Sequence, residues 1–235
     1  MNLQYYPSNS RGHADYGWLK ATYSFSFSEY YKPSRMRFGV LRVLNDDIVA
    51  PNSGFDTHPH QNMEIITIPF KGAIKHADST GGRGLITAGE IQVMSAGTGI
   101  YHSEHNGANE DLNLFQIWIF PRSKDVQPRY DQQQISNLLK PNELSLVVSG
   151  VDGNQGLYIH QDAWLSLGKF DQELTVTYKL NNPANGVFAI VIEGSCQIEN
   201  IDLSRRDAIE ITDSNQITLK TKAGLYVLFI EVPMQ

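Results

Sequence analysis

Two short segments of the sequence carry pairs of side chains that can bind a metal ion. The first is His58-Pro59-His60 and the second is His102-Ser103-Glu104. Residues two apart in a β-strand point to the same face, so each segment would present two ligand atoms side by side. Two such strands lying next to each other would surround one cation with three imidazoles and one carboxylate. That ligand set is typical of a divalent transition metal with positions left open for a substrate.

The residues around both pairs fit strand edges and turns. Pro59 cannot donate a backbone hydrogen bond, and proline is tolerated at the edges and starts of strands. Gly97 and Gly99, which precede the second pair, allow the backbone to turn tightly just before His102. We therefore expect each pair to lie where a strand meets a turn.

The histidines also allow other interpretations. The first pair could be loop histidines, and the second pair, with His105, an ordinary polar strand end; we favour a metal site because two such pairs occur close together. His13, His76 and His160 do not belong to such a group, and we expect them to be solvated or hydrogen-bonded. Cys196, the only cysteine, lies in an apolar segment and is expected in the core. A single thiol forms no intrachain disulfide, which is typical of a reducing compartment.

The chain that positions these groups has 235 residues, of which 41% are hydrophobic and 19% charged, enough to bury a sizeable core. Its formal net charge of -6 argues against direct binding to nucleic acid. The first residues lack the basic start and apolar centre of a signal peptide, and no apolar run is long enough to cross a bilayer. We therefore expect a cytoplasmic protein that makes no membrane contact.

Short apolar runs rich in β-branched and aromatic residues alternate with turn residues along the chain, which predicts an all-β protein. The expected strands include residues 23–27, 38–44, 65–70, 114–120, 187–192 and 225–232, with a turn at 45–47. The best helix candidate is the polar segment 131–139, because Pro141 follows it and would end a helix.

Two parts of the chain resemble each other. Residues 114–121 read LFQIWIFP and residues 225–233 read LYVLFIEVP. Each is preceded by an apolar strand that ends before a glycine, Gly72 in one case and Gly194 in the other. We therefore expect a duplicated β unit, with one copy on each side of the polar connection 122–142.

Longer motifs extend over nearly the whole chain. They include RGHADYGWL at 11–19, THPHQNMEI at 57–65, SAGTGIYHSE at 95–104 and PRY at 128–130. On these motifs the sequence resembles the pirin family of the cupin superfamily, and in particular the bacterial pirin-like proteins described as quercetin 2,3-dioxygenases.

The resemblance implies a bicupin fold, in which two antiparallel β-barrels of the double-stranded β-helix, or jelly-roll, type face one another. We assign residues 1–130 to an N-terminal barrel with the metal site, 131–142 to a linker, and 143–235 to a C-terminal barrel without a metal site. The histidines show the same asymmetry, because only His160 follows His105.

The resemblance also implies the metal ligands, which are His58, His60, His102 and Glu104, with Glu104 as the catalytic base. Strand parity alone leaves Glu64 open as the carboxylate ligand, because it lies four residues after His60. The resemblance implies instead that Glu64 is not a ligand but orients one of the imidazoles. The implied cofactor is one divalent transition metal per chain, with iron first and zinc, nickel, manganese, cobalt or copper as alternatives.

The activity that the resemblance implies is a metal-dependent dioxygenase that cleaves flavonols such as quercetin with O2 and releases carbon monoxide. The metal would stabilise the flavonol oxygen anion while a carboxylate takes the proton. A second class is a non-enzymatic regulatory or redox-sensing pirin that acts through a protein partner, which an acidic chain fits better than DNA. A third is a barrel that the metal only stiffens. All three need the same ligands, so the choice stays open at this point.

Overall fold

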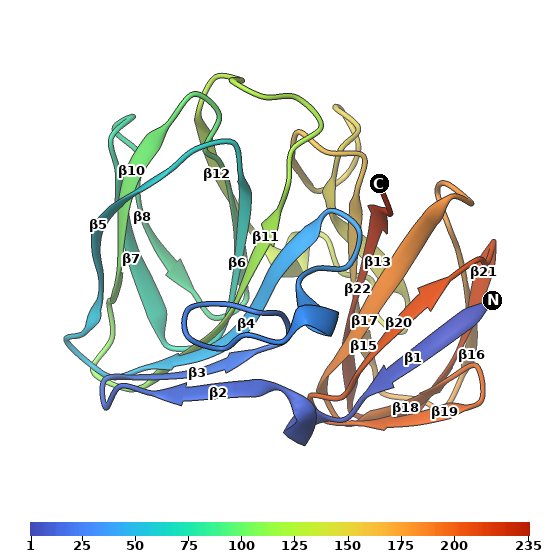
Figure 1. The fold of residues 1–235 in the computed structure, drawn as a ribbon. Coiled ribbons are helices and arrows are strands. Elements are labelled where there is room, and N and C mark those ends of the chain that lie inside the picture. The colour runs from blue at the N-terminus through green and yellow to red at the C-terminus, as the bar shows by residue number, and fades with distance from the viewer.

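The computed structural model describes residues 1–235, which form β-strands joined by turns and by three short 3-10 helices. The strands make two barrels, each built from one seven-stranded and one four-stranded sheet. Figure 1 shows the two barrels side by side, with the N-terminal one in blue to green and the C-terminal one in yellow to red. The 3-10 helices are η1 (Ser8–Ser10), η2 (Pro33–Arg35) and η3 (Ile135–Asn137).

The strands of the N-terminal barrel are β2 (Gly12–Asp15), β3 (Leu19–Tyr23), β4 (Leu41–Val49), β5 (Gly54–His60), β6 (Glu64–Lys71), β7 (Ala73–Asp78), β8 (Arg83–Thr87), β9 (Glu90–Ser95), β10 (Ile100–Asn106), β11 (Leu112–Ile119) and β12 (Arg129–Gln134). Those of the C-terminal barrel are β1 (Asn2–Tyr6), β13 (Leu144–Ser149), β14 (Leu157–Tyr158), β15 (Trp164–Phe170), β16 (Thr175–Lys179), β17 (Asn185–Glu193), β18 (Ser195–Ile198), β19 (Ile201–Ser204), β20 (Ala208–Thr212), β21 (Gln216–Thr221) and β22 (Leu225–Pro233).

Both barrels follow one strand order. The large sheets run β12-β9-β6-β11-β4-β3-β2 and β1-β20-β17-β22-β15-β13-β14, and the small sheets run β5-β10-β7-β8 and β16-β21-β18-β19. The two predicted repeat segments, β11 and β22, occupy the same place in this order. The predicted all-β, two-barrel bicupin architecture is therefore confirmed.

Two strands sit at unexpected places relative to the predicted domain limits. Strand β1 pairs with β20 along its whole length, from Asn2 opposite Thr212 to Tyr6 opposite Ala208. In Figure 1 the blue β1 accordingly lies among the orange and red strands of the C-terminal barrel. Strand β12 reaches into the range expected for the linker and pairs with β9. We keep the ranges 1–130, 131–142 and 143–235 as a proposal for the domains, with β1 belonging by hydrogen bonding to the second barrel.

Two local predictions are wrong. Residues 131–139 form no helix, because β12 runs to Gln134 and is followed only by η3; its polar composition is that of a sheet-edge strand rather than of a helix surface. Residues 45–47 form no turn, because they lie inside β4 and pair with β3 and β11. Most of the other predicted strands fall within observed ones, but β3 ends at Tyr23 and β4 begins only at Leu41.

The apolar core is distributed unevenly between the barrels. The largest cluster joins the two, with Ile66 and Phe115 from one barrel packed with Phe188 and Leu228 from the other. A second cluster fills the C-terminal barrel and includes Cys196, whose predicted core position is confirmed. The N-terminal barrel has a smaller cluster of its own, and much of its remaining interior is polar.

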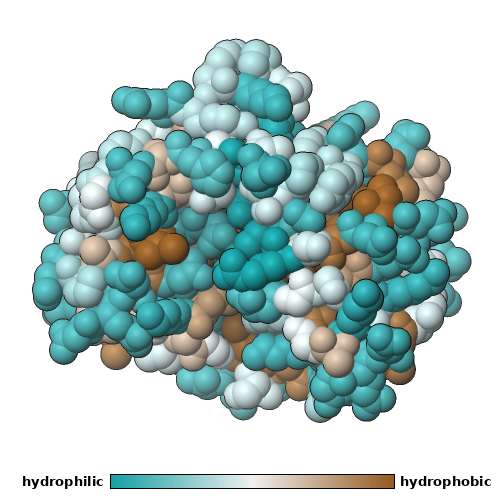
Figure 2. Space-filling view, turned by 90° about the horizontal axis from the view of Figure 1, so that it is seen from below, coloured by the Kyte–Doolittle hydropathy of each residue, from teal (hydrophilic) through white to brown (hydrophobic).

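The surface carries apolar groups only in separate patches on the face seen in Figure 2, where hydrophilic side chains surround them. Scattered apolar residues of this kind are normal for a folded domain. None of the helices is long and apolar enough to span a lipid bilayer.

Candidate metal centre

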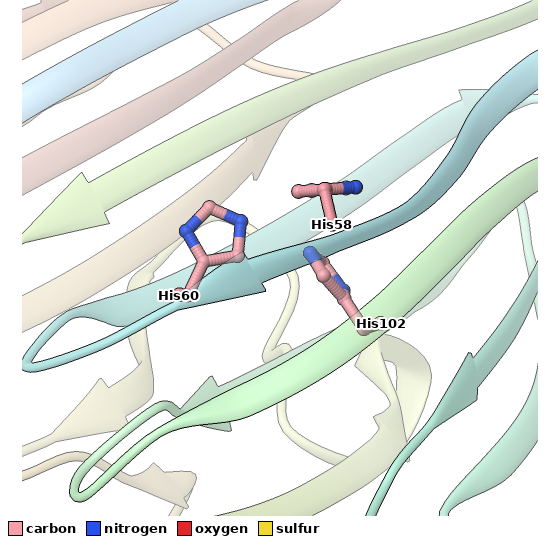
Figure 3. Close-up of side chains that lie close together, drawn as sticks. All are labelled: His58, His60 and His102. Carbon is pink, nitrogen blue, oxygen red and sulfur yellow. The ribbon is translucent and has the colours of Figure 1, made fainter.

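Three histidines from two neighbouring strands converge inside the N-terminal barrel. Strands β5 and β10 are antiparallel, with His58 directly opposite His102 and His60 opposite Ile100. The ring centroids lie 4.4 Å apart for His58 and His102, and 4.9 Å apart for each of the other two pairs. One nitrogen from each ring lies within 4.8 Å of the others, and Figure 3 shows the rings from the two strands gathered together.

Local features of the two strands fit this convergence. Pro59 lies on β5, which is an edge strand, as its missing N–H requires. The pairing register of β5 and β10 shifts between His102 and Glu104, and such bulges redirect side chains near functional sites. Before β10 the backbone turns at Gly97 and Gly99, whose φ angles are +47° and +137°. A side chain at Gly97 would also collide with the carbonyl oxygen of Val126.

The protonation of these imidazoles suits metal binding. Burial, reinforced by the neighbouring histidines, lowers the pKa of His102 to about 3, and burial together with His58 lowers the pKa of His60 to about 4. Both rings are therefore neutral near pH 7 and have a free lone pair. The Nδ1 of His58 lies 2.7 Å from the carbonyl oxygen of Asp56 and donates to it, which leaves the Nε2 lone pair free.

His102 needs a partner that the protein alone does not supply. The residue is 2% exposed, and neither of its ring nitrogens has a hydrogen-bond partner. Leaving buried polar atoms unpaired costs free energy, and a bound cation would remove that cost for one nitrogen. The donor set of neutral imidazoles and a nearby carboxylate fits a divalent transition metal.

Glu104 lies on the same face of β10 as His102 but one step further into the barrel. Its Oε2 accepts a hydrogen bond of 2.9 Å from Gln116, and its Oε1 lies 3.5 Å from the hydroxyl of Thr67. Burial raises the pKa of Glu104 to about 7. Its carboxylate forms a second group of candidate ligands with His102 and His76, rather than joining the three histidines as one compact group.

Glu64, the alternative carboxylate, faces elsewhere. Its Oε2 accepts a hydrogen bond of 2.6 Å from Ser95, and on β6 it shares a face with Ile66, which packs in the core between the barrels. The parity argument fails because the chain turns at Asn62, with φ of +50°, and enters a different sheet before Glu64. Glu64 therefore belongs to neither group of candidate ligands.

His76 is hydrogen-bonded, as expected, but it also lies beside His102 and Glu104, which the spacing argument did not predict. It is buried, its ring lies 5.5 Å from that of His102, and its Nε2 is 2.9 Å from Asp78. Spacing in the sequence could not have singled it out, because an aspartate follows His13, His76 and His160 alike at a distance of two residues. By contrast, His13 and His160 lie outside the cluster and have side-chain partners in Thr22 and Tyr158, as expected for hydrogen-bonded residues.

A cavity of about 280 Å³ adjoins the histidines. Apolar rings line part of it and polar groups line the rest: Phe27, Phe55 and Trp118, then Asn45, Asp47 and Gln116, together with His58, His60, His102 and Glu104. A larger hollow of about 820 Å³ lies between the barrels, but it contains none of these residues.

The cavity holds a second carboxyl group that sequence reasoning did not single out. Asp47 is 5% exposed, and its Oδ1 has no hydrogen-bond partner. Burial, with smaller contributions from Asp46 and Glu104, raises the pKa of Asp47 to about 8. The cavity thus contains two carboxyl groups whose pKa burial raises, that of Asp47 to about 8 and that of Glu104 to about 7. The three predicted histidines are brought together, with Glu104 and Asp47 next to them.

Comparison with known proteins gives matches along both barrels. A family model described as Pirin matches residues 6–119, and one described as the quercetinase C-terminal cupin domain matches residues 146–232. The chain is 37% identical over 227 residues to quercetin 2,3-dioxygenase of Escherichia coli strain K12, covering 96% of each protein. It is 40% identical to a pirin-like protein of Caulobacter vibrioides, covering 91% of this chain and 92% of the relative.

Solved structures give the same match in three dimensions. The crystal structure of YhhW from Escherichia coli superposes with a TM-score of 0.93 at 36% identity, covering 99% of this chain and 98% of that one. A structure of bacterial pirin YhhW in complex with nickel(II) gives the same TM-score and identity, and covers 99% of each chain.

Proposed function

The chain belongs to the pirin family, and from that premise we propose that it is a metal-dependent dioxygenase that cleaves flavonols such as quercetin with O2 and releases carbon monoxide. One observation carries the proposal: the three-histidine cluster forms part of the wall of a cavity that is otherwise lined by aromatic rings and hydrogen-bonding groups. Flat hydroxylated aromatic molecules fit such a combination of surfaces.

The proposed cofactor is one divalent transition metal per chain, with iron as our first choice. The proposed ligands are His58, His60, His102 and Glu104. The neutral rings and the unpaired nitrogens of His102 support this set, and the nickel(II) complex of bacterial pirin YhhW supports binding of a transition metal within the family. When bound, the cation would supply Lewis-acid stabilisation of a substrate oxygen anion.

Glu104 is the proposed catalytic base that takes the proton from the flavonol hydroxyl. A base works best when its pKa lies near the working pH, and burial raises the pKa of Glu104 to about 7. The hydrogen bonds from Gln116 and Thr67 hold the carboxylate in place, so the accepting oxygen has a fixed position. The low exposure of Glu104 keeps competing water away from the transferred proton.

The remaining cavity residues would bind the rest of the substrate. Phe27, Phe55 and Trp118 offer apolar surface to flat rings, while Asn45 and Asp47 each have a buried oxygen free to accept a hydrogen bond from a hydroxyl group. This division favours a substrate that is apolar on its faces and carries hydroxyl groups on its rim.

Flavonol turnover with and without metal tests the proposal. Protein reconstituted with iron(II) should consume quercetin only when O2 is present and should release carbon monoxide, while chelated protein should do neither. Quercetin loss at the same rate with chelated protein would indicate autoxidation and contradict the proposal. A non-enzymatic role through a protein partner would then account better for the same metal site.

A further inference from the structure

A histidine and an aspartate lie directly behind the metal centre on the next strand of the small sheet. Strand β7 pairs with β10 so that His76 is opposite Glu104 and Asp78 is opposite His102. The side chains of His76 and Asp78 are completely buried, and the His76 Nε2 lies 2.9 Å from Oδ2 of Asp78. Neither residue is among the proposed ligands.

The environment of Asp78 fixes its charge. Its Oδ1 accepts hydrogen bonds from the backbone N–H of Thr80, the hydroxyl of Thr80 and the backbone N–H of Gly82, at 2.8, 2.6 and 3.0 Å. Burial alone would raise the pKa of Asp78, but these bonds and the one from His76 outweigh it and lower that pKa. Asp78 is therefore a carboxylate, and only Oδ2 remains for His76.

That charge determines which nitrogen of His76 carries the proton. A carboxylate only accepts hydrogen bonds, so Nε2 of His76 must be the donor and Nδ1 must hold the lone pair of the neutral ring. The ring of Tyr130 stacks on His76, with centroids 4.6 Å apart and planes at 27°, which limits rotation of the imidazole. The Nδ1 atom is buried and has no partner.

His102 presents the complementary requirement. A neutral imidazole that binds a cation through one nitrogen carries a proton on the other, and that N–H needs an acceptor when it is buried. A nitrogen of His76 lies within 4.8 Å of a nitrogen of His102 and of a carboxylate oxygen of Glu104. Glu104 is itself a proposed ligand of the cation, whereas Nδ1 of His76 is free to act as the acceptor.

We propose that His76 is a positioning residue for the metal centre: when a cation is bound, Nδ1 of His76 accepts a hydrogen bond from the ring nitrogen of His102 that faces away from the cation, a bond that neither atom makes in this structure. Asp78 fixes the tautomer of His76 that this bond requires. The inference rests on the metal-binding part of the proposed function. Partners of this kind orient the ligand and raise its basicity, and losing one typically lowers metal affinity by about 10- to 100-fold.

The substitution Asp78→Asn tests the tautomer with little change of shape. The Asn Oδ1 can still accept from Thr80 and Gly82, which turns the amide NH2 toward His76. The NH2 donates, so Nε2 of His76 must become the acceptor and its proton must move to Nδ1. Two N–H groups would then face each other between His76 and His102, and cobalt(II) affinity should fall by about 10- to 100-fold.

A matched control lies on the same pair of strands as the ligands. His105 and Asp56 also form a histidine–carboxylate pair, at 3.5 Å, but their side chains are 41% and 100% exposed. His105→Phe should leave cobalt(II) affinity unchanged. His76→Phe keeps a flat ring against Tyr130 while removing the lone pair, and it should match the effect of Asp78→Asn.

The measurement is cobalt(II) affinity by chelator competition, with metal stoichiometry and the thermal unfolding of each metal-free variant recorded alongside. The proposal expects one cobalt(II) per chain in all variants and weaker binding in Asp78→Asn and His76→Phe alone. Unchanged cobalt(II) affinity in Asp78→Asn overturns the proposal. A second cobalt(II) ion that binds to the wild type but not to His76→Phe also overturns it, because His76 would then be a ligand. If His76→Phe fails to fold, Asp78→Asn decides. Wild-type protein that binds no cobalt(II) refutes the proposed metal site itself, whereas wild-type binding with unaltered variants refutes only this inference.

Discussion

The two barrels can be compared position by position. Gly72 precedes β7 and Gly194 precedes β18, so residues at the same distance from these glycines are equivalent, and so are their partners on the neighbouring strands. At these positions the N-terminal barrel turns a polar side chain inward where the C-terminal barrel turns an apolar one. The equivalent pairs are His76 and Ile198, Glu104 and Leu219, His102 and Ile217, Thr67 and Ala189, and Gln116 and Phe229. All five residues of the C-terminal barrel belong to its apolar cluster.

The difference shows what a metal centre requires of a barrel. The C-terminal barrel uses its interior for packing, which stabilises the fold through buried apolar area. The N-terminal barrel uses the same positions for ligands and their supports, and it relies on the shared core between the barrels for much of its apolar burial. The polar side chains at these positions therefore serve the metal site and give up the apolar packing that stabilises the C-terminal barrel, which is a common compromise at functional sites.

Two buried glutamates, Glu104 in the N-terminal barrel and Glu231 in the C-terminal barrel, differ in their surroundings. In the C-terminal barrel, Glu231 accepts five hydrogen bonds of 2.8 to 3.0 Å from Tyr178, Asn181, Asn182 and Asn185. In the N-terminal barrel, Glu104 has two partners, one of them at 3.5 Å. A saturated carboxylate holds structure together, whereas an unsaturated one keeps capacity for a cation or a proton.

The largest expected effect separates Glu104 from Glu64 by activity. Glu104→Gln removes the negative charge and the basic oxygen, so flavonol turnover should fall by about 10²- to 10⁴-fold. Metal affinity should fall with it. Glu64 lies outside the cluster, so Glu64→Gln should reduce turnover by less than the roughly 10- to 100-fold that is typical of residues that support a ligand. Turnover and metal occupancy at one metal concentration measure both; a metal-free Glu64 variant beside a loaded, active Glu104 variant would reverse the assignment.

A comparison of stability separates Glu231 from Glu104. Glu231→Ala leaves five donors without their acceptor and should reduce the free energy of unfolding by about 3–5 kcal/mol. Glu104→Ala in metal-free protein loses fewer bonds and should cost much less. Urea unfolding of both variants in the presence of a chelator provides the comparison, and equal losses would show that the two carboxylates do the same structural work.

Metal should stabilise the protein through the N-terminal barrel. Free metal at a hundredfold excess over its dissociation constant should add about 2.7 kcal/mol to the free energy of unfolding. For a chain of this size that corresponds to roughly 5–10 °C in melting temperature. The double variant His58→Ala and His102→Ala should bind no metal and show no shift. Elemental analysis should give one equivalent in the wild type, and two equivalents would contradict a site confined to one barrel.

The smallest effect concerns the pH dependence of the metal-free protein. Burial raises the pKa of Asp47 to about 8, so the folded state keeps a proton that the unfolded state releases at much lower pH. Stability that depends on this proton is lost as the pH rises through 8, and between pH 7 and 8 Asp47 should account for about 1 kcal/mol. Asp47→Asn should flatten that decline. Unfolding by urea at the two pH values tests it, and an unaltered slope would contradict the buried, protonated Asp47.

The sequence contained enough information for the barrels and for three of the site residues. Alternating apolar residues predicted strands such as β11 and β22, because strand periodicity is a local property. The two-residue spacing of His58 and His60 placed both rings on one face, since that also depends only on neighbouring residues. The same rule failed for Glu64, because the turn at Asn62 resets the alternation of faces.

The remaining features depend on contacts between distant parts of the chain. The polar residues of β4 are typical of a turn. They lie in a strand because Asn45 and Asp47 face the cavity, and the cavity cannot be foreseen from neighbouring residues alone. His76 looks isolated until β7 is paired with β10. The placement of β1 on β20 leaves no local trace in the sequence, because the hydrogen bonds of an edge strand are made by backbone atoms that every residue has.

The pairing of β1 with β20 also sets an order of events during protein synthesis. Tyr6 and Glu210, whose side chains bond across these strands, are 204 residues apart. At the usual rate of translation, the ribosome needs about 10–40 s to make the chain between them. The strands of the N-terminal barrel, β2 to β12, are complete well before that interval ends and can close on each other. Strand β1 thus leaves the ribosome long before β20 and is among the last strands to find its partner, and a bulky group attached next to it, ahead of Asn2, should slow closure of the second barrel while leaving the metal-binding barrel free to fold.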